Sequence, residues 1–342
     1  MAQTLAVKYR PKTFDDVTEQ VNTKIILQQQ LESGEIKNAY LFVGGAGTGK
    51  TTCARIFAHD INGGQGNPIE LDAASNSSVD DVRNIIQQAK TKSLDSEYKV
   101  FLIDECHAIS NTGWQAFLKL IEEPPAKSIF IFCTTNPEKI PKTILSRVQR
   151  YDFQRISQKG IVDRLSYIIT QEYEVMNGGY WEALEYIAKL AEGGMRDAIT
   201  MLDKCLSFSK ELTVDNVVKA LGVANYDNMI EITSAYIFGE PDKLIKSIES
   251  VHSSGVDMKQ FIRQYLNFVL DIKKWFILGD FKYLQIPQID TIEEFIKDID
   301  ELDDTWDNIS KLLDTIIKVN AEIKYDSNPK YLIEAMLLEN MK

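Results

Sequence analysis

The chain has 342 residues, of which 44% are apolar and 26% are charged, and its formal net charge is −12. This length predicts two or three domains, and the composition is ordinary for a globular protein. No run of about 18 apolar residues occurs, and residues 1–12 lack the apolar centre of a signal peptide, so we expect a cytoplasmic protein without a membrane partner.

The charge is unevenly distributed along the chain. Residues 1–155 contain 18 basic and 18 acidic residues, whereas the remainder contains 20 basic and 32 acidic residues. All of the excess acid therefore lies after residue 155. Two parts of such different charge argue against one uniform domain.

The cysteines give no sign of a crosslink or of a metal site. Cys53, Cys106, Cys133 and Cys205 are widely spaced, and no two of them form a C-x-x-C pair. We therefore predict four reduced, mostly buried thiols, with no disulfide framework and no zinc.

In the first 155 residues, short apolar runs alternate with stretches of helical periodicity. The expected strands cover residues 40–43, 69–72, 100–103 and 128–133, and the expected helices cover residues 50–59, 79–90 and 114–123. Strands that alternate with helices form a parallel sheet covered on both faces. The sequence therefore begins with an α/β domain.

From about residue 156 the periodicity is almost entirely helical. Five residues near the C-terminus recur at steps of three and four and predict one buried stripe: Leu302, Trp306, Ile309, Leu313 and Ile316. Pro329 fits the first turn of a last helix that runs through Leu338. We divide the chain into an α/β domain of residues 1–155, a small helical domain of residues 156–220 and an all-helical domain of residues 221–342.

The strongest chemical motif follows the first expected strand and opens the next helix. It has the form G-x-x-x-x-G-K-[ST]. Its residues are Gly44, Gly45, Ala46, Gly47, Thr48, Gly49, Lys50 and Thr51, with Thr52 following in the helix. Glycines let backbone N–H groups turn toward phosphate oxygens, and the helix N-terminus adds positive potential. Lys50 can then reach the β- and γ-phosphates of ATP, and the Thr51 hydroxyl can bind Mg²⁺.

A second motif ends the strand of residues 100–103. Asp104 comes at the carboxyl end of that strand, where open α/β sheets bind ligands, and its carboxylate suits the Mg²⁺ shell. Glu105 follows directly and can polarise an attacking water. Together with the phosphate loop, the pair predicts hydrolysis of ATP rather than transfer to another substrate.

Two arginines are further candidates. Arg147 follows the last expected strand after a short helix, and Arg196 begins a helix in the second domain. Arginine side chains stabilise the charge on a transferring γ-phosphate, sometimes from a neighbouring subunit.

These residues together resemble an AAA+ ATPase, and the chain is most similar to the gamma/tau subunit family of the bacterial DNA polymerase III clamp loader. The matching stretches are residues 8–14 (KYRPKTF), 39–42 (AYLF), the phosphate loop, 71–75 (LDAAS), 102–105 (LIDE), 120–125 (LIEEPP), 134–141 (TTNPEKIP), 143–147 (TILSR) and 192–198 (EGGMRDA). The resemblance weakens after residue 220. It implies an AAA+ domain with a parallel sheet, a helical lid domain and an all-α collar domain.

The resemblance also implies individual roles. Thr135 matches sensor 1, Arg147 matches the arginine finger that reaches the next subunit's ATP, and Arg196 matches sensor 2. Arg10, Pro11 and Val17 match the segment that covers adenine. The implied cofactors are ATP and Mg²⁺.

Three departures separate this chain from the family pattern. The four-cysteine zinc module after the phosphate-loop helix is missing, since residues 59–68 contain glycines and no cysteine. Val148 stands where the family has the cysteine of its Ser-Arg-Cys motif, and the chain ends at Lys342 without a long tail. We expect a trimmed or divergent homologue; if it is encoded by a phage, it would act in the host cytoplasm.

The implied function is that of an ATP-driven motor subunit that opens a sliding clamp and loads it onto primer–template DNA for replication. Its implied partners are other loader subunits, delta-like and delta-prime-like or copies of itself, in a pentamer. DNA contact should be to the phosphate backbone, for which Arg83, Lys90 and Lys92 are candidates.

Two alternatives remain open from the sequence. One is a non-catalytic scaffold subunit of a clamp loader, against which the intact Lys50, Thr51, Asp104 and Glu105 argue. The other is a different AAA+ DNA motor, such as a branch-migration ATPase, which would need a DNA-binding domain where this chain is acidic and helical.

Overall fold

The structure is a computed structural model that describes residues 3–75, 79–93, 95–172, 180–221, 226–286, 290–302 and 304–341. Its contacts divide the chain into two compact units, Met1–Leu206 and Ser207–Lys342. The finer division into three domains stays a prediction.

The first unit is built on a parallel sheet of five strands in the order β2-β3-β4-β1-β5. The strands are β1 (Ala39–Gly44), β2 (Ile69–Asp72), β3 (Lys99–Asp104), β4 (Ser128–Thr134) and β5 (Gln149–Phe153). Four of them agree with the expected strands to within one residue at either end. The fifth, β5, was not foreseen as a strand, because its short sequence QRYDF alternates polar and aromatic residues at the sheet edge.

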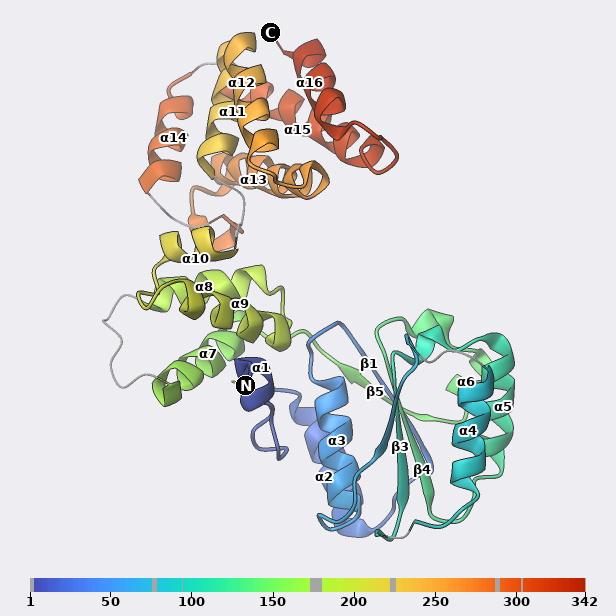
Figure 1. The fold of residues 1–342 in the computed structure, drawn as a ribbon. Helices are drawn as coiled ribbons and strands as arrows, with labels where there is room; N and C mark the ends of the chain where they lie inside the picture. Colours follow the sequence, from blue (N-terminus) through green and yellow to red (C-terminus); the bar gives the residue numbers. More distant parts are fainter. Residues whose placement is uncertain are drawn as a thin grey trace. The chain divides into compact units, whose positions relative to one another are not determined.

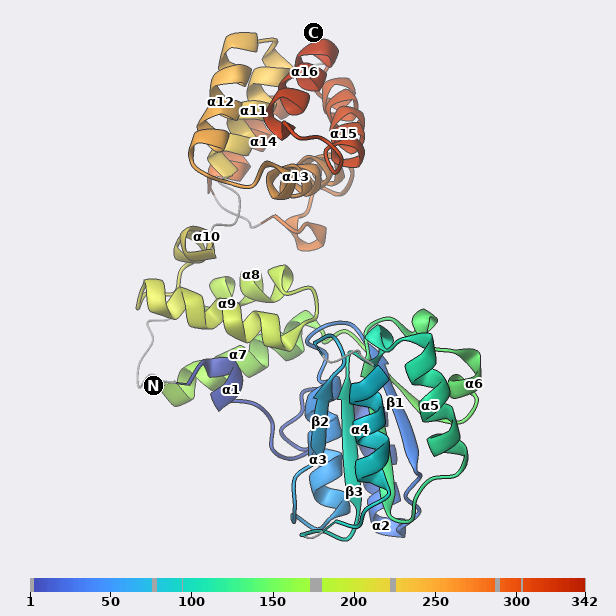
Figure 2. The same cartoon turned by 45° about the vertical axis from the view of Figure 1, so that its right-hand side comes forward.

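Helices cover both faces of this sheet, as the alternation of elements predicts (Figure 1; Figure 2). One face carries α2 (Val21–Ser33) and α3 (Lys50–Ile61), and the other carries α4 (Val79–Ala89), α5 (Asn111–Glu122) and α6 (Lys142–Leu145). Successive side chains of a strand point to opposite faces. The interiors of the central strands β3, β4 and β1 are therefore apolar, with polar residues only at the strand ends, and alternate residues bury against alternate helical layers.

The N-terminal segment joins the helices that follow the sheet. Helix α1 (Leu5–Lys8) lies against α7 (Gln158–Glu172) and α9 (Met195–Phe208), and α7 packs on α8 (Tyr180–Leu190). The N–H of Leu5 donates to Asp203 Oδ2 at 3.1 Å, and Lys8 forms an ion pair with Glu172 at 2.6 Å. The start of the chain is thereby tied to a segment about 160–200 residues later.

Among its described residues, the second unit consists of helices joined by short connecting segments, without a strand. It comprises α10 (Val214–Leu221), α11 (Tyr226–Phe238), α12 (Pro241–Ser253), α13 (Met258–Leu278), the short 3₁₀ helix η3 (Phe281–Tyr283), α14 (Asp290–Asp300), α15 (Thr305–Glu322) and α16 (Pro329–Asn340). Its apolar core draws on α11 to α16. Pro329 is at the first turn of α16, as predicted, and the helix ends two residues later than expected.

One carboxylate is buried inside this second unit. Asp271 on α13 is 1% exposed, and it forms an ion pair with Lys274 at 2.7 Å. Its Oδ2 also accepts from the backbone N–H groups of Gln285 and Ile286, at 2.5 and 3.0 Å. This single side chain therefore fixes the segment that follows η3 onto α13.

The predicted stripe on α15 is partly wrong. Ile309, Leu313 and Ile316 are buried, but Leu302 precedes the helix and Trp306 is 45% exposed, with the Lys273 ammonium 5.1 Å from its ring centre. The buried face also includes the polar Thr305 and Asn308. Polar residues occupy some of the inward positions of α15, so the spacing of apolar residues alone wrongly predicted that Trp306 is buried.

The four cysteines are buried, as predicted, and they are free thiols. Across the residues that the structure describes, no helix is both long and apolar enough to cross a lipid bilayer.

Candidate nucleotide-binding site

The site is assembled at the carboxyl edge of the sheet. Strand β1 leads into the phosphate loop, β3 ends at Asp104, and β4 ends just before Thr135. Because the strands are parallel and β4 lies between β1 and β3, all three segments meet at one edge. The strand order also puts Thr135 between the phosphate loop and the acidic pair.

The phosphate loop needs glycine at several positions. Gly47 and Gly49 have φ of +69° and +99°, in the left-handed region that other residues avoid. A Cβ on Gly44 would lie 2.5 Å from the carbonyl oxygen of Phe153, so β5 packs directly against the loop. The spacing of these glycines is therefore a steric requirement of the loop.

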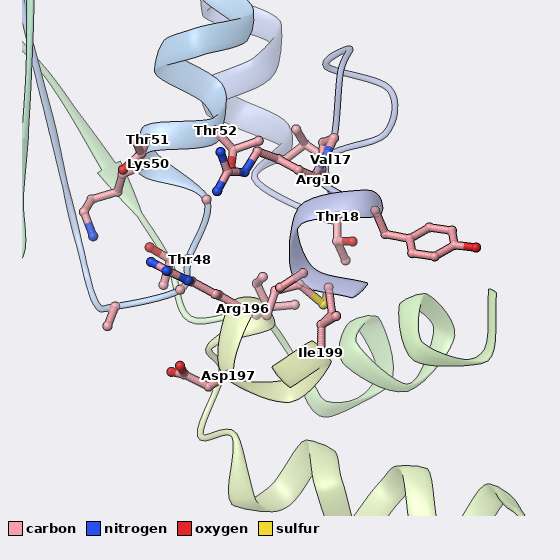
Figure 3. Close-up of a pocket in the computed structure, with 18 of the residues that line it drawn as sticks. Arg10, Val17, Thr18, Thr48, Lys50, Thr51, Thr52, Arg196, Asp197 and Ile199 are labelled. Carbon is pink, nitrogen blue, oxygen red and sulfur yellow. The ribbon is translucent and has the colours of Figure 1, made fainter. Parts of the chain in front are cut away.

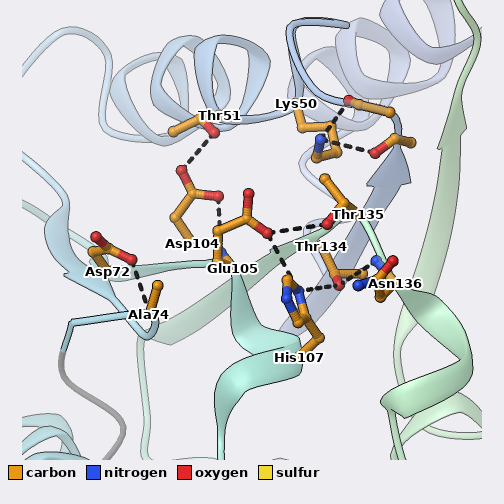
Figure 4. A network of polar contacts seen from close by, with 12 residues as sticks. Lys50, Thr51, Asp72, Ala74, Asp104, Glu105, His107, Thr134, Thr135 and Asn136 are labelled. Atoms are coloured by element: carbon orange, nitrogen blue, oxygen red, sulfur yellow. Dashed lines mark hydrogen bonds and ion pairs between the residues drawn. The ribbon is translucent and has the colours of Figure 1, made fainter. Parts of the chain in front are cut away.

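Lys50 is buried at the base of the loop. Its ammonium donates to the carbonyl oxygens of Gly44 and Gly45, at 2.9 and 2.7 Å (Figure 4). Burial lowers the pKa of Lys50, because desolvation penalises its charged form, while nearby Asp104 and Glu105 act in the opposite direction. A phosphate group carries formal negative charge and is a stronger acceptor for this ammonium than two neutral carbonyls.

Thr51 and Asp104 form the pair expected for a magnesium ion. The Thr51 hydroxyl donates to Asp104 Oδ2 at 2.7 Å, and Asp104 Oδ1 accepts from the N–H of Glu105 at 3.0 Å. Mg²⁺ takes oxygen ligands, and it usually needs only one or two protein groups because phosphates and waters complete its shell. In the described ranges, no group of three or more His, Cys, Asp or Glu side chains is arranged to hold a metal ion by itself, and this hydroxyl–carboxylate pair fits such a sparse shell.

Glu105 belongs to a second polar network (Figure 4). It has φ of +47° and precedes the 3₁₀ helix η1 (Cys106–Ala108). Its Oε2 lies 3.3 Å from the Thr135 hydroxyl and 3.2 Å from Nδ1 of His107. The same Nδ1 is 3.2 Å from the Thr134 hydroxyl, which accepts from the N–H of Asn136 at 3.0 Å.

Glu105 and most of the phosphate loop border a cavity of about 340 Å³, which is large enough for a small-molecule ligand (Figure 3). The predicted residues that line it are Arg10, Pro11, Val17, Ala46, Gly47, Thr48, Gly49, Lys50, Thr51, Thr52, Asp104, Glu105 and Arg196. The N-terminal segment, the phosphate loop and the start of α9 thus form one site. Of the other residues proposed for nucleotide chemistry, Gly44 and Gly45 accept from Lys50, and Thr135 adjoins Glu105.

Positive charge gathers around this cavity. Arg10, Arg55 and Arg196 all line it, together with Lys50. Burial lowers the pKa of Arg10, and the charges of Arg55 and Arg196 lower it further because like charges repel. A polyanion would relieve this repulsion, as a nucleoside triphosphate does.

Several residues of the site were not foreseen from the sequence. Tyr9, Thr18, Arg55, Arg164 and Ile199 also line the cavity. Arg55 lies on α3, one turn beyond the motif, and its guanidinium pairs in bidentate fashion with Glu70 at 2.7 and 2.6 Å. In the sequence, only its position in the same expected helix as Lys50 indicated that Arg55 could lie near the nucleotide site.

Gln20 is a second unforeseen residue, and it joins three segments of the site. It is 8% exposed, and its Nε2 donates to the carbonyl oxygens of Thr48 and Gln154, at 3.3 and 2.7 Å. Its Oε1 accepts from the N–H of Gln154 at 3.1 Å. The side chain therefore holds the phosphate loop beside the segment that leaves β5.

Arg147 does not line the cavity of its own chain among the described residues. Its guanidinium forms an ion pair with Glu122 at the end of α5, at 2.8 Å, and donates to the carbonyl oxygen of Thr143 at 2.8 Å. The side chain is 40% exposed. This position suits a group that serves another molecule, and its assignment as an arginine finger stays a prediction.

None of the candidate DNA contacts lines the nucleotide cavity. Arg83 is on α4, and Lys90 and Lys92 follow that helix, all with exposed side chains. The end of α4 leads into the amino end of β3, as the 2.8 Å bond from Lys99 to the carbonyl of Gln88 illustrates, whereas Asp104 is at the other end of that strand. The structure thus brings none of these three residues to the cavity, and DNA contact stays a prediction.

Two family models match the first unit and the residues that follow it. Residues 69–157 match the model described as "DNA polymerase III, delta subunit", and residues 160–211 match the "DNA polymerase III clamp loader subunit, ATPase lid domain". The first match includes Asp104, Glu105, Thr135 and Arg147, and the second includes Arg196.

Whole-chain relatives extend this similarity. The chain is 31% identical to the DNA polymerase III subunit tau of Bacillus subtilis, over 98% of this chain and 63% of that protein. It is also 31% identical to the DNA polymerase III subunit gamma of Buchnera aphidicola, over 98% of this chain and 95% of that protein. The chain spans well under two thirds of several longer relatives, including 41% of the tau/gamma subunit of Haemophilus influenzae.

A solved structure shares the fold at lower identity. The Holliday junction branch migration motor RuvB of Thermotoga maritima superposes with a TM-score of 0.52 and 22% identity, covering 73% of this chain and 86% of RuvB. At this low identity, the likeness to RuvB shows the fold alone. The match to a gamma subunit over nearly the full length of both chains shows the family. The chain belongs to the gamma/tau subunit family of bacterial DNA polymerase III.

Proposed function

We propose that this protein is an ATP-hydrolysing motor subunit of a clamp loader, which opens a sliding clamp and loads it onto primer–template DNA. The observation that carries the proposal is the gathering of Lys50, Thr51, Asp104, Glu105 and Arg196 around one cavity. A non-catalytic scaffold has no need for a buried lysine beside a hydroxyl–carboxylate pair.

Each residue has a role that its position supports. Lys50 exchanges its two loop carbonyls for the β- and γ-phosphates. Thr51 and Asp104 would hold Mg²⁺ through oxygen, and the ion would neutralise charge on the phosphates. Glu105 accepts a proton from the attacking water, Thr135 senses the γ-phosphate from the segment just after β4, and Arg196 senses it from α9.

In the cell, we propose that the protein assembles with other loader subunits, including delta-like and delta-prime-like subunits or copies of itself, into a pentamer. Arg147 then leaves Glu122 and reaches the ATP of the neighbouring subunit. ATP favours the assembly that grips the clamp, and hydrolysis removes that preference, because a ligand shifts an equilibrium only through its differential affinity.

Contact with DNA is proposed to go to the phosphate backbone, since a loader acts at any primer. Arg83, Lys90 and Lys92 are the candidate residues. Each phosphate contact that is lost should reduce the salt dependence of binding by about one unit of slope.

The test is ATP turnover by the full chain with its companion subunits, the cognate clamp and primed DNA. Lys50→Ala should abolish turnover, whereas Lys37→Ala, an exposed lysine before β1, should leave it unchanged. Equal turnover by the wild type and by Lys50→Ala would contradict the motor function and favour the scaffold alternative.

A further inference from the structure

We infer that His107 is a positioning residue, which holds the carboxylate of Glu105 in the orientation needed to take a proton from water. This inference rests on the proposed ATPase function. The contact that carries it is the 3.2 Å separation between His107 Nδ1 and Glu105 Oε2. The two side chains are 19% and 37% exposed, so the histidine is the more enclosed partner.

The direction of this hydrogen bond follows from the chemistry of the two groups. An ionised carboxylate has no proton and only accepts, so the contact is attractive only when Nδ1 carries the hydrogen. His107 is therefore assigned the Nδ1–H tautomer. The local backbone supports the arrangement, since the N–H of Ala108 donates to the carbonyl oxygen of Glu105 at 3.0 Å and closes the 3₁₀ turn between the two side chains.

The same imidazole nitrogen has a second contact, with the end of β4. Thr134 is fully buried at the end of β4, and its hydroxyl oxygen lies 3.2 Å from the same Nδ1. That oxygen also accepts from the N–H of Asn136 at 3.0 Å, which fixes its position. A chain of contacts thus runs from the central strand through His107 to Glu105, and it restricts the rotamers of this partly exposed carboxylate side chain.

The two oxygens of Glu105 are left in different situations. Oε2 is held by His107 and by the Thr135 hydroxyl, at 3.2 and 3.3 Å. Among the described residues, Oε1 takes part in no hydrogen bond or ion pair, and Glu105 lines the cavity. One oxygen is therefore anchored while the other remains able to accept a proton from water. Geometry of this kind is what a general base needs.

Three substitutions at one position separate positioning from general structural support. His107→Ala removes the donor. His107→Asn can put an amide N–H near the position of Nδ1, whereas His107→Gln puts it near Nε2, which does not face Glu105. His59→Ala is the matched control, because His59 is an exposed histidine on α3 of the same unit.

The first measurement is steady-state ATP turnover by the full chain assembled with its companion subunits, clamp and primed DNA. We expect His107→Ala to lower kcat on the order of tenfold, which is part of the 10²–10⁴-fold that a general base contributes, with KM unchanged. His107→Asn should restore more of the rate than His107→Gln, and His59→Ala should match the wild type. A normal kcat for His107→Ala, or equal rates for the Asn and Gln variants, would overturn the inference.

A double-substitution cycle with Glu105→Gln sharpens the result. A residue that acts only through Glu105 has nothing left to position in the Glu105→Gln background, so adding His107→Ala should cause no further loss. An additive loss would show that His107 acts by another route and would refute the inference. If Glu105→Gln itself turns over ATP like the wild type, the proposed hydrolytic mechanism fails, which is a distinguishable outcome.

The tautomer gives a test that does not depend on turnover. Imidazole nitrogen shifts in ¹⁵N-labelled protein should show His107 with its proton on Nδ1, in a signal that is lost in His107→Asn. A neutral His107 with its proton on Nε2 would be unable to donate to Glu105 and would overturn the inference.

Discussion

The backbone N–H of Met195, the first residue of α9, donates to the carbonyl oxygen of Gly47 in the phosphate loop across 3.0 Å. The preceding residue, Gly194, packs so closely that a Cβ on Gly47 would lie 2.9 Å from its Cα. The loop and the helix that carries Arg196 therefore meet backbone to backbone. A shift of the phosphate loop should therefore displace the start of α9, and a shift of α9 should displace the loop.

This contact predicts the effect of a methyl group at Gly47. Gly47→Ala should lower the affinity for ATP by at least about tenfold, or about 1.4 kcal/mol, because the new Cβ forces the loop away from Gly194. Gly34→Ala is the control, since Gly34 has a similar φ of +72° but no atom within 4 Å of the new Cβ. Both substitutions put a Cβ on a residue with left-handed backbone, which costs about 1–2 kcal/mol in each case. Only Gly47→Ala adds a clash with Gly194, and titration of both variants with a fluorescent ATP analogue measures its effect on affinity. Equal affinities in the two variants would contradict it.

Arg147 provides a second prediction. Arg147→Ala should leave ATP affinity within about twofold of the wild type and reduce clamp- and DNA-stimulated hydrolysis by about 10³-fold or more, because an arginine finger acts on the transition state. Arg150→Ala is the matched control, since Arg150 is an equally exposed arginine three residues later whose partner is Asp152. Both quantities can be measured in the assembled complex. Retained stimulation in Arg147→Ala would rule out the assignment as a finger.

The buried carboxylate of the second unit predicts a loss of stability. Asp271→Ala leaves Lys274 and two backbone N–H groups without their acceptor, which should cost about 3 kcal/mol of unfolding free energy. Asp298→Ala, at an exposed position on α14, should change it by less than about 0.5 kcal/mol. Urea unfolding followed by hydrogen exchange in peptides of α13 measures both. A similar small effect of the two changes would mean that Asp271 does not hold the segment after η3.

The buried thiols predict how stability depends on pH. Burial raises the pKa of Cys53 to about 12 and raises that of Cys133 well above its usual range. The unfolded thiol ionises near pH 8.5, so above that pH the unfolded state has lost protons that the folded state keeps. This contribution to stability is complete below about pH 8.5 and declines by up to about 1.4 kcal/mol per thiol and pH unit above it.

Unfolding free energies of the wild type and of Cys133→Ala between pH 7 and 10.5 test this prediction. The cavity left by the substitution costs the same at every pH, so only the slope is informative. The variant should lose stability less steeply than the wild type above about pH 8.5. Parallel curves would be incompatible with a raised pKa for Cys133.

The nucleotide site was largely foreseeable because its residues are adjacent in sequence to strand ends. Lys50 and Thr51 follow β1 directly, and Asp104 ends β3, so the parallel order of the strands brings them together. Local spacing was sufficient in these cases, since the sheet converts adjacency to a strand end into proximity in space.

Other features depend on packing that local spacing does not encode. The partners of Gln20 at Gln154 and of Leu5 at Asp203 are more than 130 residues away, and no motif links them. Trp306 fits an apolar stripe but faces outward, because polar residues take the inward positions beside it. Lys90 lies near the amino end of β3 because α4 ends there. The presence of a basic residue in the sequence does not reveal this position.

The side chain of Gln20 has a consequence for the exposed rim of the sheet. Strand β5 is an outermost strand, and such strands invite pairing with other molecules through their free N–H and C=O groups. Gln20 donates to the carbonyl and accepts from the N–H of Gln154, immediately after β5, as a neighbouring strand would. One glutamine amide thereby occupies both backbone groups of the residue that follows this edge strand, so neither of them is free to pair with another chain at that point.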